Sequence, residues 1–213
     1  MTRLPTSTRR ALGLVRSQPL QAGFSLVTTL ILLIVVTLLG VGASQMVLLS
    51  EKSTRFDRDQ QIAFQAAEAA LVDAEFDIRG PNTAAGQRLG IFTGKNDKNV
   101  EFIDGCGTNT SAGLCSNLPV LVNGSLKEVM YGVDFTDTSN NSKTVGFGQF
   151  TGRTFSTGST GLRSEIAPRY IIELIPDPAS SSTQPRVLYR VTAMGFGPKK
   201  ETQAVIQMVF RKE

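Results

Sequence analysis

The 213-residue chain has no histidine, no tryptophan and only two cysteines. Without histidine it has neither a Ser-His-Asp triad nor an imidazole ligand for a metal ion. Two cysteines alone do not complete a four-ligand zinc site. The sequence therefore predicts no catalytic residues, no cofactor-binding residues and no metal site, and we expect that the chain is not an enzyme.

Acidic residues are absent from the first 50 positions, and residues 17–50 carry no charge of either sign. The formal net charge is +4, but the first 23 residues contain four arginines and no acid. The rest of the chain holds 18 basic and 18 acidic residues. Phosphate binding needs a local excess of positive charge, so the overall charge gives no support to a nucleic-acid partner, and none is expected. The four arginines are Arg3, Arg9, Arg10 and Arg16.

What the chain does have is a long apolar run over residues 24–49. As a helix this run would be about 39 Å long, which exceeds the ~30 Å hydrocarbon core of a bilayer. Because the arginines precede the run, the positive-inside rule predicts a cytoplasmic N-terminus and export of the chain after Glu51. The alternatives are a plain single-pass anchor and an ordinary cleaved signal peptide with a small-residue site at 41–43. The run is longer than the 7–15 residues usual in such signals.

The four residues at the start of this run, Gly23-Phe24-Ser25-Leu26, resemble the processing site of type IV prepilins. The resemblance implies that residues 1–23 are a leader and that prepilin peptidase cleaves the Gly23–Phe24 bond. It also implies N-methylation of Phe24, and a transmembrane helix over residues 24–50 that later packs in the fibre core. The family usually has Glu at the fifth mature position, whereas this chain has Thr28. In the family that Glu pairs with the N-terminal amine of the subunit above, so its absence fits a subunit at the tip.

The helical pattern continues after the apolar run. Apolar and small residues with 4-3-4-3-4 spacing predict one buried face on an amphipathic second half, residues 51–79. Gly80-Pro81 is a stop signal, which predicts a helix over residues 24–79, about 84 Å long. The residues of the predicted face are Gln60, Phe64, Ala67, Leu71, Ala74 and Ile78.

Two segments resemble the PilX group of type IV minor pilins: residues 63–71, AFQAAEAAL, and the ending around residues 189–197. The resemblance implies an α+β, type IV pilin-like fold, in which a long N-terminal helix packs on an antiparallel β-sheet. Residues 80–213 would form a periplasmic sheet domain, held by the inner membrane until the subunit reaches the pilus tip. The implied function is a minor pilin that primes pilus assembly at or near the fibre tip. The implied partners are other minor pilins, a tip adhesin, the major pilin, prepilin peptidase and the inner membrane. The alternatives are a type II secretion minor pseudopilin and a DNA-uptake pilin.

Within the predicted sheet domain, strong β-formers predict five strands, of which the last two form an antiparallel hairpin. These strands are Val120–Val122, Lys127–Asp134, Arg169–Ile175, Val187–Met194 and Gln203–Phe210. If this part lies outside the cytoplasm, we expect a disulfide between Cys106 and Cys115.

Two polar clusters in the same region have an ordinary interpretation. The first, Asp134, Asp137, Asn140 and Asn141, has oxygen atoms that suit Ca²⁺, but the spacing lacks the Gly and closing Glu of an EF-hand loop. We interpret these side chains as turn residues. The second cluster is basic, and we expect it to be a solvated face. Its members are Arg153, Arg163 and Arg169.

Overall fold

The computed structural model describes residues 24–81, 84, 86–95, 99–158, 162–181, 183 and 185–212. Gly23 and the rest of the predicted leader lie outside these residues. The chain divides into two compact units, Met1–Glu51 and Lys52–Glu213, each of which is described by itself.

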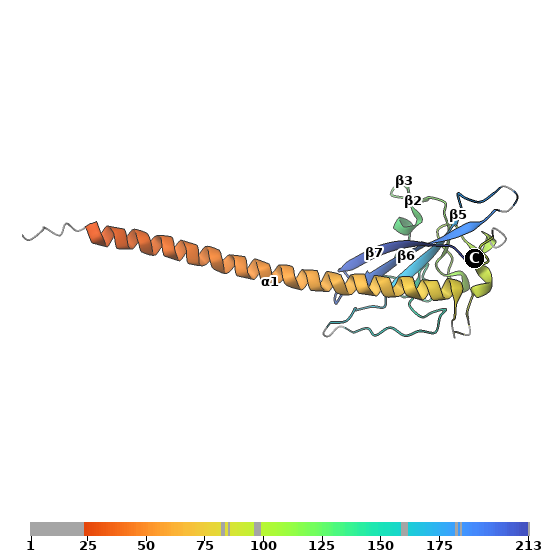
Figure 1. The fold of residues 1–213 in the computed structure, drawn as a ribbon, viewed down its shortest axis with the longest axis horizontal. Coiled ribbons are helices and arrows are strands. Elements are labelled where there is room, and N and C mark those ends of the chain that lie inside the picture. Colours follow the sequence, from red (N-terminus) through yellow and green to blue (C-terminus); the bar gives the residue numbers. More distant parts are fainter. Residues whose placement is uncertain are drawn as a thin grey trace, which may run out of the picture. The chain divides into compact units, whose positions relative to one another are not determined.

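One helix, α1, covers Phe24–Arg79, as the pattern predicted (Figure 1). It begins at the first residue after the predicted cleavage site and ends where Gly80 takes a φ of 76°. Positive φ is cheap for glycine, and here it lets the Gly80 N–H donate to the Phe76 carbonyl oxygen at 2.8 Å. In the first unit the helix is long and apolar enough to cross a membrane.

In the second unit α1 buries a face made mainly of alanine. Ala63, Ala67, Ala70 and Ala74 are completely buried against the sheet domain. The predicted face was wrong at Phe64, whose side chain is 46% exposed. Small side chains let the helix backbone come close to the sheet, and a phenylalanine ring does not fit in so narrow a gap.

Glycine on the sheet makes the close approach possible. A Cβ added at Gly195 would lie 2.1 Å from the Ala63 carbonyl oxygen and 2.2 Å from the Ala67 nitrogen. Real Cβ atoms do not come this close to backbone atoms, so only glycine fits at this position. The helix therefore packs on the sheet through backbone contact between residues far apart in the sequence.

The main sheet has five strands in the order β1-β5-β6-β7, with β4 also pairing with β5. Pairs β5–β6, β6–β7 and β4–β5 are antiparallel, whereas β1 runs parallel to β5. The α+β pilin-like class is therefore confirmed, with a sheet that is mixed rather than purely antiparallel. The strands are β1 (Leu114–Ser116), β4 (Val145–Gly146), β5 (Arg169–Pro176), β6 (Val187–Phe196) and β7 (Gln203–Phe210).

The middle region differs from its prediction. Strand β2 (Val120–Val122) is confirmed, and it forms a separate two-stranded sheet with β3 (Ser125–Lys127). The predicted strand Lys127–Asp134 is wrong, because Val129–Gly132 forms a 3₁₀ helix, η4. A tight turn at Asn123 and Gly124, both with positive φ, pairs β3 with β2 immediately. The chain then bends so that the Val129 side chain enters the core, where it is 1% exposed.

Each face of the sheet covers its own core. The face toward α1 carries Tyr170, Ile172, Tyr189 and Val191, which are buried with the alanine face. The opposite face carries Ile171 and Phe196, which are buried with Cys106, Cys115, Val129 and Phe135. The predicted disulfide is present in this second core, with an S–S distance of 2.00 Å between Cys106 and Cys115.

Candidate interaction surfaces

Residues 24–50 of α1, within the first unit, form an apolar helix segment without charged side chains. The large apolar side chains of residues 26–49 are between 46% and 73% exposed. The hydroxyls of Thr29 and Thr37 donate to backbone carbonyls three residues earlier, at 2.9 and 2.8 Å. Thr28 does the same at 3.0 Å, to the Ser25 carbonyl. A helix that is apolar all round needs a bilayer or other helices around it, so this segment is suited to association.

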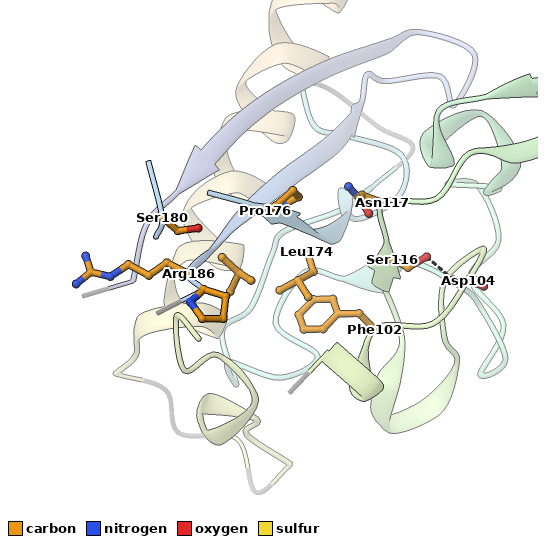
Figure 2. Close-up of a pocket in the computed structure, with 10 residues that line it drawn as sticks. Phe102, Asp104, Ser116, Asn117, Leu174, Pro176, Ser180 and Arg186 are labelled. Carbon is orange, nitrogen blue, oxygen red and sulfur yellow. Dashed lines mark hydrogen bonds between the residues drawn. The ribbon is translucent and has the colours of Figure 1, made fainter. Parts of the chain in front are cut away.

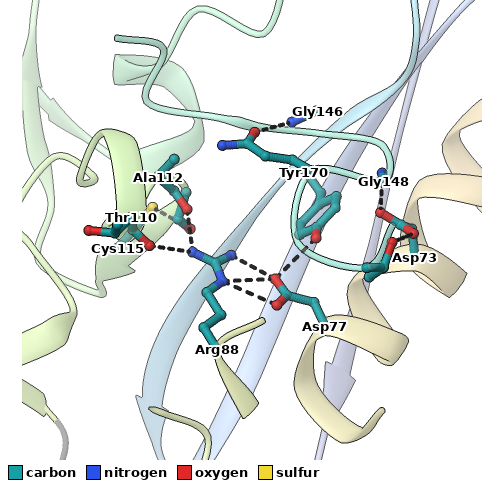
Figure 3. A network of polar contacts seen from close by, with 12 residues as sticks. Asp73, Asp77, Arg88, Thr110, Ala112, Cys115, Gly146, Gly148 and Tyr170 are labelled. Carbon is teal, nitrogen blue, oxygen red and sulfur yellow. Dashed lines mark hydrogen bonds and ion pairs between the residues drawn. The ribbon is translucent and has the colours of Figure 1, made fainter. Parts of the chain in front are cut away.

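The second unit is held together by a buried polar network centred on Asp77 of α1 (Figure 3). Arg88, in the segment after the helix, donates to the Asp77 carboxylate through Nε at 3.0 Å and Nη2 at 2.7 Å. The Tyr170 hydroxyl of β5 donates to the same carboxylate at 3.1 Å. A third Arg88 nitrogen, Nη1, donates to the Ala112 carbonyl at 2.7 Å, inside the loop that the disulfide closes. One guanidinium therefore joins the helix to the disulfide loop.

The network is buried, and its burial affects the Tyr170 phenol. The Asp77 and Arg88 side chains are only 0% and 4% exposed. Burial raises the pKa of Tyr170 well above its ordinary value, and the negative charge of Asp77 raises it further. The phenol therefore stays protonated and acts as a donor. A buried carboxylate is stable only when it is paired and hydrogen-bonded, and Arg88 and Tyr170 satisfy both needs.

A second buried carboxylate, Asp73, lies one helical turn before Asp77. It accepts hydrogen bonds from the Gly148 backbone N–H at 2.8 Å and from the Thr151 hydroxyl at 2.5 Å. Burial raises the pKa of Asp73, while those two hydrogen bonds and the charge of Arg153 oppose the rise. The Arg153 guanidinium lies 3.9 Å from Asp73 and over the Phe76 ring. This carboxylate ties α1 to the loop after β4.

Neither carboxylate is among the residues predicted from the sequence, although the sequence contains a signal for both. Asp73 and Asp77 are four residues apart and flank Ala74, on the helical side that the alanines predict to be buried. Charged residues at such spacing on a buried face call for partners inside the fold. Asp77 is bonded to Arg88 and Tyr170, and Asp73 to the loop that holds Gly148 and Thr151. None of these partners belongs to the helix, so no local pattern points to them.

Two expectations about polar clusters have different outcomes. The expectation that Arg169 lies on a solvated face is wrong, because its guanidinium is buried and donates to the Thr144 hydroxyl and carbonyl. Asp134 and Asp137 accept hydrogen bonds from the backbone of Thr136 and Ser139, both at 2.8 Å, as turn residues do. Within the described ranges, no three acidic or cysteine side chains gather where they would hold a metal ion.

Two cavities in the second unit share two lining residues, and we call the pair of cavities the basic groove. Arg186 and Val187 line both cavities. The first, of about 410 Å³, lies where β1 and β5 end, with Phe102 and Leu174 beside each other at its centre (Figure 2). The second, of about 400 Å³, is lined by four basic residues and one acidic residue. These are Lys95, Arg186, Arg211, Lys212 and Asp177.

Comparison with known proteins assigns both ends of the chain to one family. Residues 22–72 match a family model described as PilX N-terminal, and residues 105–212 match one described as type IV pilus assembly protein PilX C-term. No curated protein and no solved structure gives a significant match. The second model alone spans more than half of the chain, and it covers the disulfide loop, Tyr170 and strands β1 to β7. The chain therefore belongs to the PilX family of type IV pilus assembly proteins, whose role is structural rather than catalytic.

Proposed function

We propose that this chain is a minor pilin that primes assembly of the type IV pilus and remains at or near the fibre tip. A role in pilus assembly follows from the family, and the priming role and the tip position are the further step. The observation that carries the proposal is Thr28, an uncharged residue in a helix segment without any charge between residues 24 and 50.

Cleavage after Gly23 would create a positively charged N-terminal amine on Phe24. In a fibre whose helices pack side by side, each subunit offers an acid to the amine of the subunit above it. A charge left unpaired in that apolar environment costs several kcal/mol. The Thr28 hydroxyl carries no negative charge and already donates to the Ser25 carbonyl at 3.0 Å. A subunit with Thr28 therefore fits best where no subunit stands above it.

The proposal includes the path by which the chain reaches that position. Prepilin peptidase cleaves after Gly23 and methylates the amine of Phe24. The apolar part of α1 holds the subunit in the inner membrane, with the N-terminus in the cytoplasm and the second unit in the periplasm. The partners are other minor pilins, the major pilin and an adhesin at the tip. The family descriptions name the pilus, which favours this function over a type II secretion pseudopilin.

The decisive test places an acid at position 28. Immunogold labelling of fibres with an antibody to the second unit should mark the ends only. In a Thr28→Glu variant the new carboxylate can pair with an amine above, so label should also occur along the shaft. Thr28→Gln, which has the shape of Glu without its charge, is the matched control and should label the ends alone. Label along the shaft of the unmodified fibre would refute the tip position.

A further inference from the structure

We propose that the basic groove binds an acidic segment of a partner protein, in which one or two carboxylates lie next to an apolar residue. The groove lies wholly within the second unit, so the proposal holds whether or not the subunit occupies the fibre tip. It assigns an interaction surface and the chemistry of its ligand, which the family match leaves open.

The second cavity has more basic than acidic residues among those described. Among the described residues, Arg211 has an ion-pair partner, the Asp177 carboxylate at 2.9 Å. Lys95 and Arg186 are exposed, and no carboxylate of the described residues lies within 4.0 Å of either side chain. Among the described residues that line this cavity, four are basic and one is acidic. An incoming carboxylate would therefore meet guanidinium and ammonium groups with which no other described carboxylate pairs.

The half-buried ammonium of Lys212 also favours an anionic ligand. The ammonium lies 2.6 Å from the Ile78 carbonyl oxygen at the end of α1, and the residue is half-buried. Burial lowers the pKa of Lys212, and the positive charge of Arg79 lowers it further. A carboxylate bound beside it would favour the charged ammonium, so the site gains from an anion.

The first cavity would bind the apolar residue next to the carboxylate of the partner segment. Phe102 and Leu174 offer an apolar floor, and Val187 continues this floor to the basic cavity. Ser116 and Asn117 line the same cavity with groups that can hydrogen-bond a peptide backbone. Apolar pockets with a few polar groups at the rim are typical of sites that take one large side chain. Because the two cavities share two lining residues, one extended segment can fill both.

The acidic residues of the groove favour a peptide over a nucleic acid. Asp104 lines the first cavity and Asp177 the second. A phosphate backbone carries a charge on every nucleotide and would meet both carboxylates, which repel it. A peptide with one or two carboxylates places them only beside the basic residues.

The test uses the full chain in nonionic detergent and a library of random eight-residue peptides as the probe. Peptides are selected on the immobilised chain and counter-selected on an Arg186→Glu variant. The groove should select peptides with one or two Asp or Glu next to Leu, Ile or Phe. By fluorescence anisotropy at low salt, Arg186→Glu should weaken the binding of a selected peptide about fivefold, because a partly exposed charge pair contributes up to about 1 kcal/mol. Lys95→Glu should act in the same direction.

Matched control variants distinguish binding in the groove from nonspecific electrostatic attraction between an acidic peptide and the protein. Arg163→Glu and Lys199→Glu make the same charge changes at exposed positions outside the groove and should leave binding unchanged. Replacing the peptide's acids with amides should weaken binding about fivefold. Replacing its apolar residue with Ser should weaken binding about tenfold or more, because burial of a Leu, Ile or Phe side chain contributes about 1.5–3 kcal/mol. The proposal is wrong if no selected peptide depends on Arg186, if acid-free peptides are selected, or if Arg163→Glu acts as strongly as Arg186→Glu. Tighter, Arg186-dependent binding of a 20-base-pair DNA duplex would also overturn it.

Discussion

Neutralising Asp77 should destabilise the second unit far more than neutralising an exposed acid on the same helix. In Asp77→Asn the side chain keeps its shape, but Arg88, whose side chain is 4% exposed, loses its counter-charge. Breaking one side of a buried pair costs about 3–5 kcal/mol. The matched control is Glu75→Gln, because Glu75 and Arg79 form a pair at 3.2 Å with 43% and 47% exposure. That control should cost at most about 0.5 kcal/mol.

The measurement is urea unfolding of the full chain in detergent, followed by tyrosine fluorescence. The chain has three tyrosines, Tyr131, Tyr170 and Tyr189, all in the second unit, so the signal reports that unit alone. With a slope of about 2 kcal/mol/M, a loss of 4 kcal/mol lowers the midpoint by about 2 M. Because ordinary domains have only about 5–15 kcal/mol of stability, this is a large share of the total.

A double-mutant cycle then tests whether the pair itself carries the effect. In Asp77→Asn combined with Arg88→Met, the unpaired guanidinium is gone. The double variant should therefore be more stable than the sum of the two single changes predicts, by about 2 kcal/mol. If the two changes add to within about 0.5 kcal/mol, or if Asp77→Asn costs no more than Glu75→Gln, the reasoning about the buried network is refuted.

Two further predictions concern glycines. Gly23→Leu should block leader removal, so that the intact mass of the protein extracted from membranes includes residues 1–23. The intact mass of the unmodified protein should match residues 24–213 with one methyl group. If the variant also has the mature mass, the cleavage site lies elsewhere. Gly195→Ala should lower the free energy of unfolding by about 2–3 kcal/mol, because its Cβ would lie 2.1 Å from a helix carbonyl oxygen. Gly90→Ala, where a Cβ meets nothing within 4 Å, should change it by less than about 0.5 kcal/mol in the same urea assay, and equal effects of the two would contradict the close contact.

The elements that could be predicted from the sequence are those whose signals are local. The end of α1 was predictable because Gly80 and Pro81 stop a helix whatever lies around them. Strands β5 and β7 agree with their predicted bounds to within one residue, and β6 extends two residues further, because dense runs of β-branched and aromatic residues favour extended chain. The apolar run that begins at Phe24 and the Thr28 that stands where the family usually has Glu could be identified from the sequence directly, and the proposed function depends mainly on them.

Which surfaces pack against each other became clear from the folded chain alone. The buried face of α1 is turned away from Phe64, because Gly195 on β6 brings the backbones too close for a ring. The partner of Asp77 is Arg88, and the parallel partner of β1 is β5. These contacts depend on the shape and charge of residues that are distant along the chain. A local sequence pattern does not show which residues outside its own element will contact it. The buried network and the basic groove therefore become visible only in the packed structure.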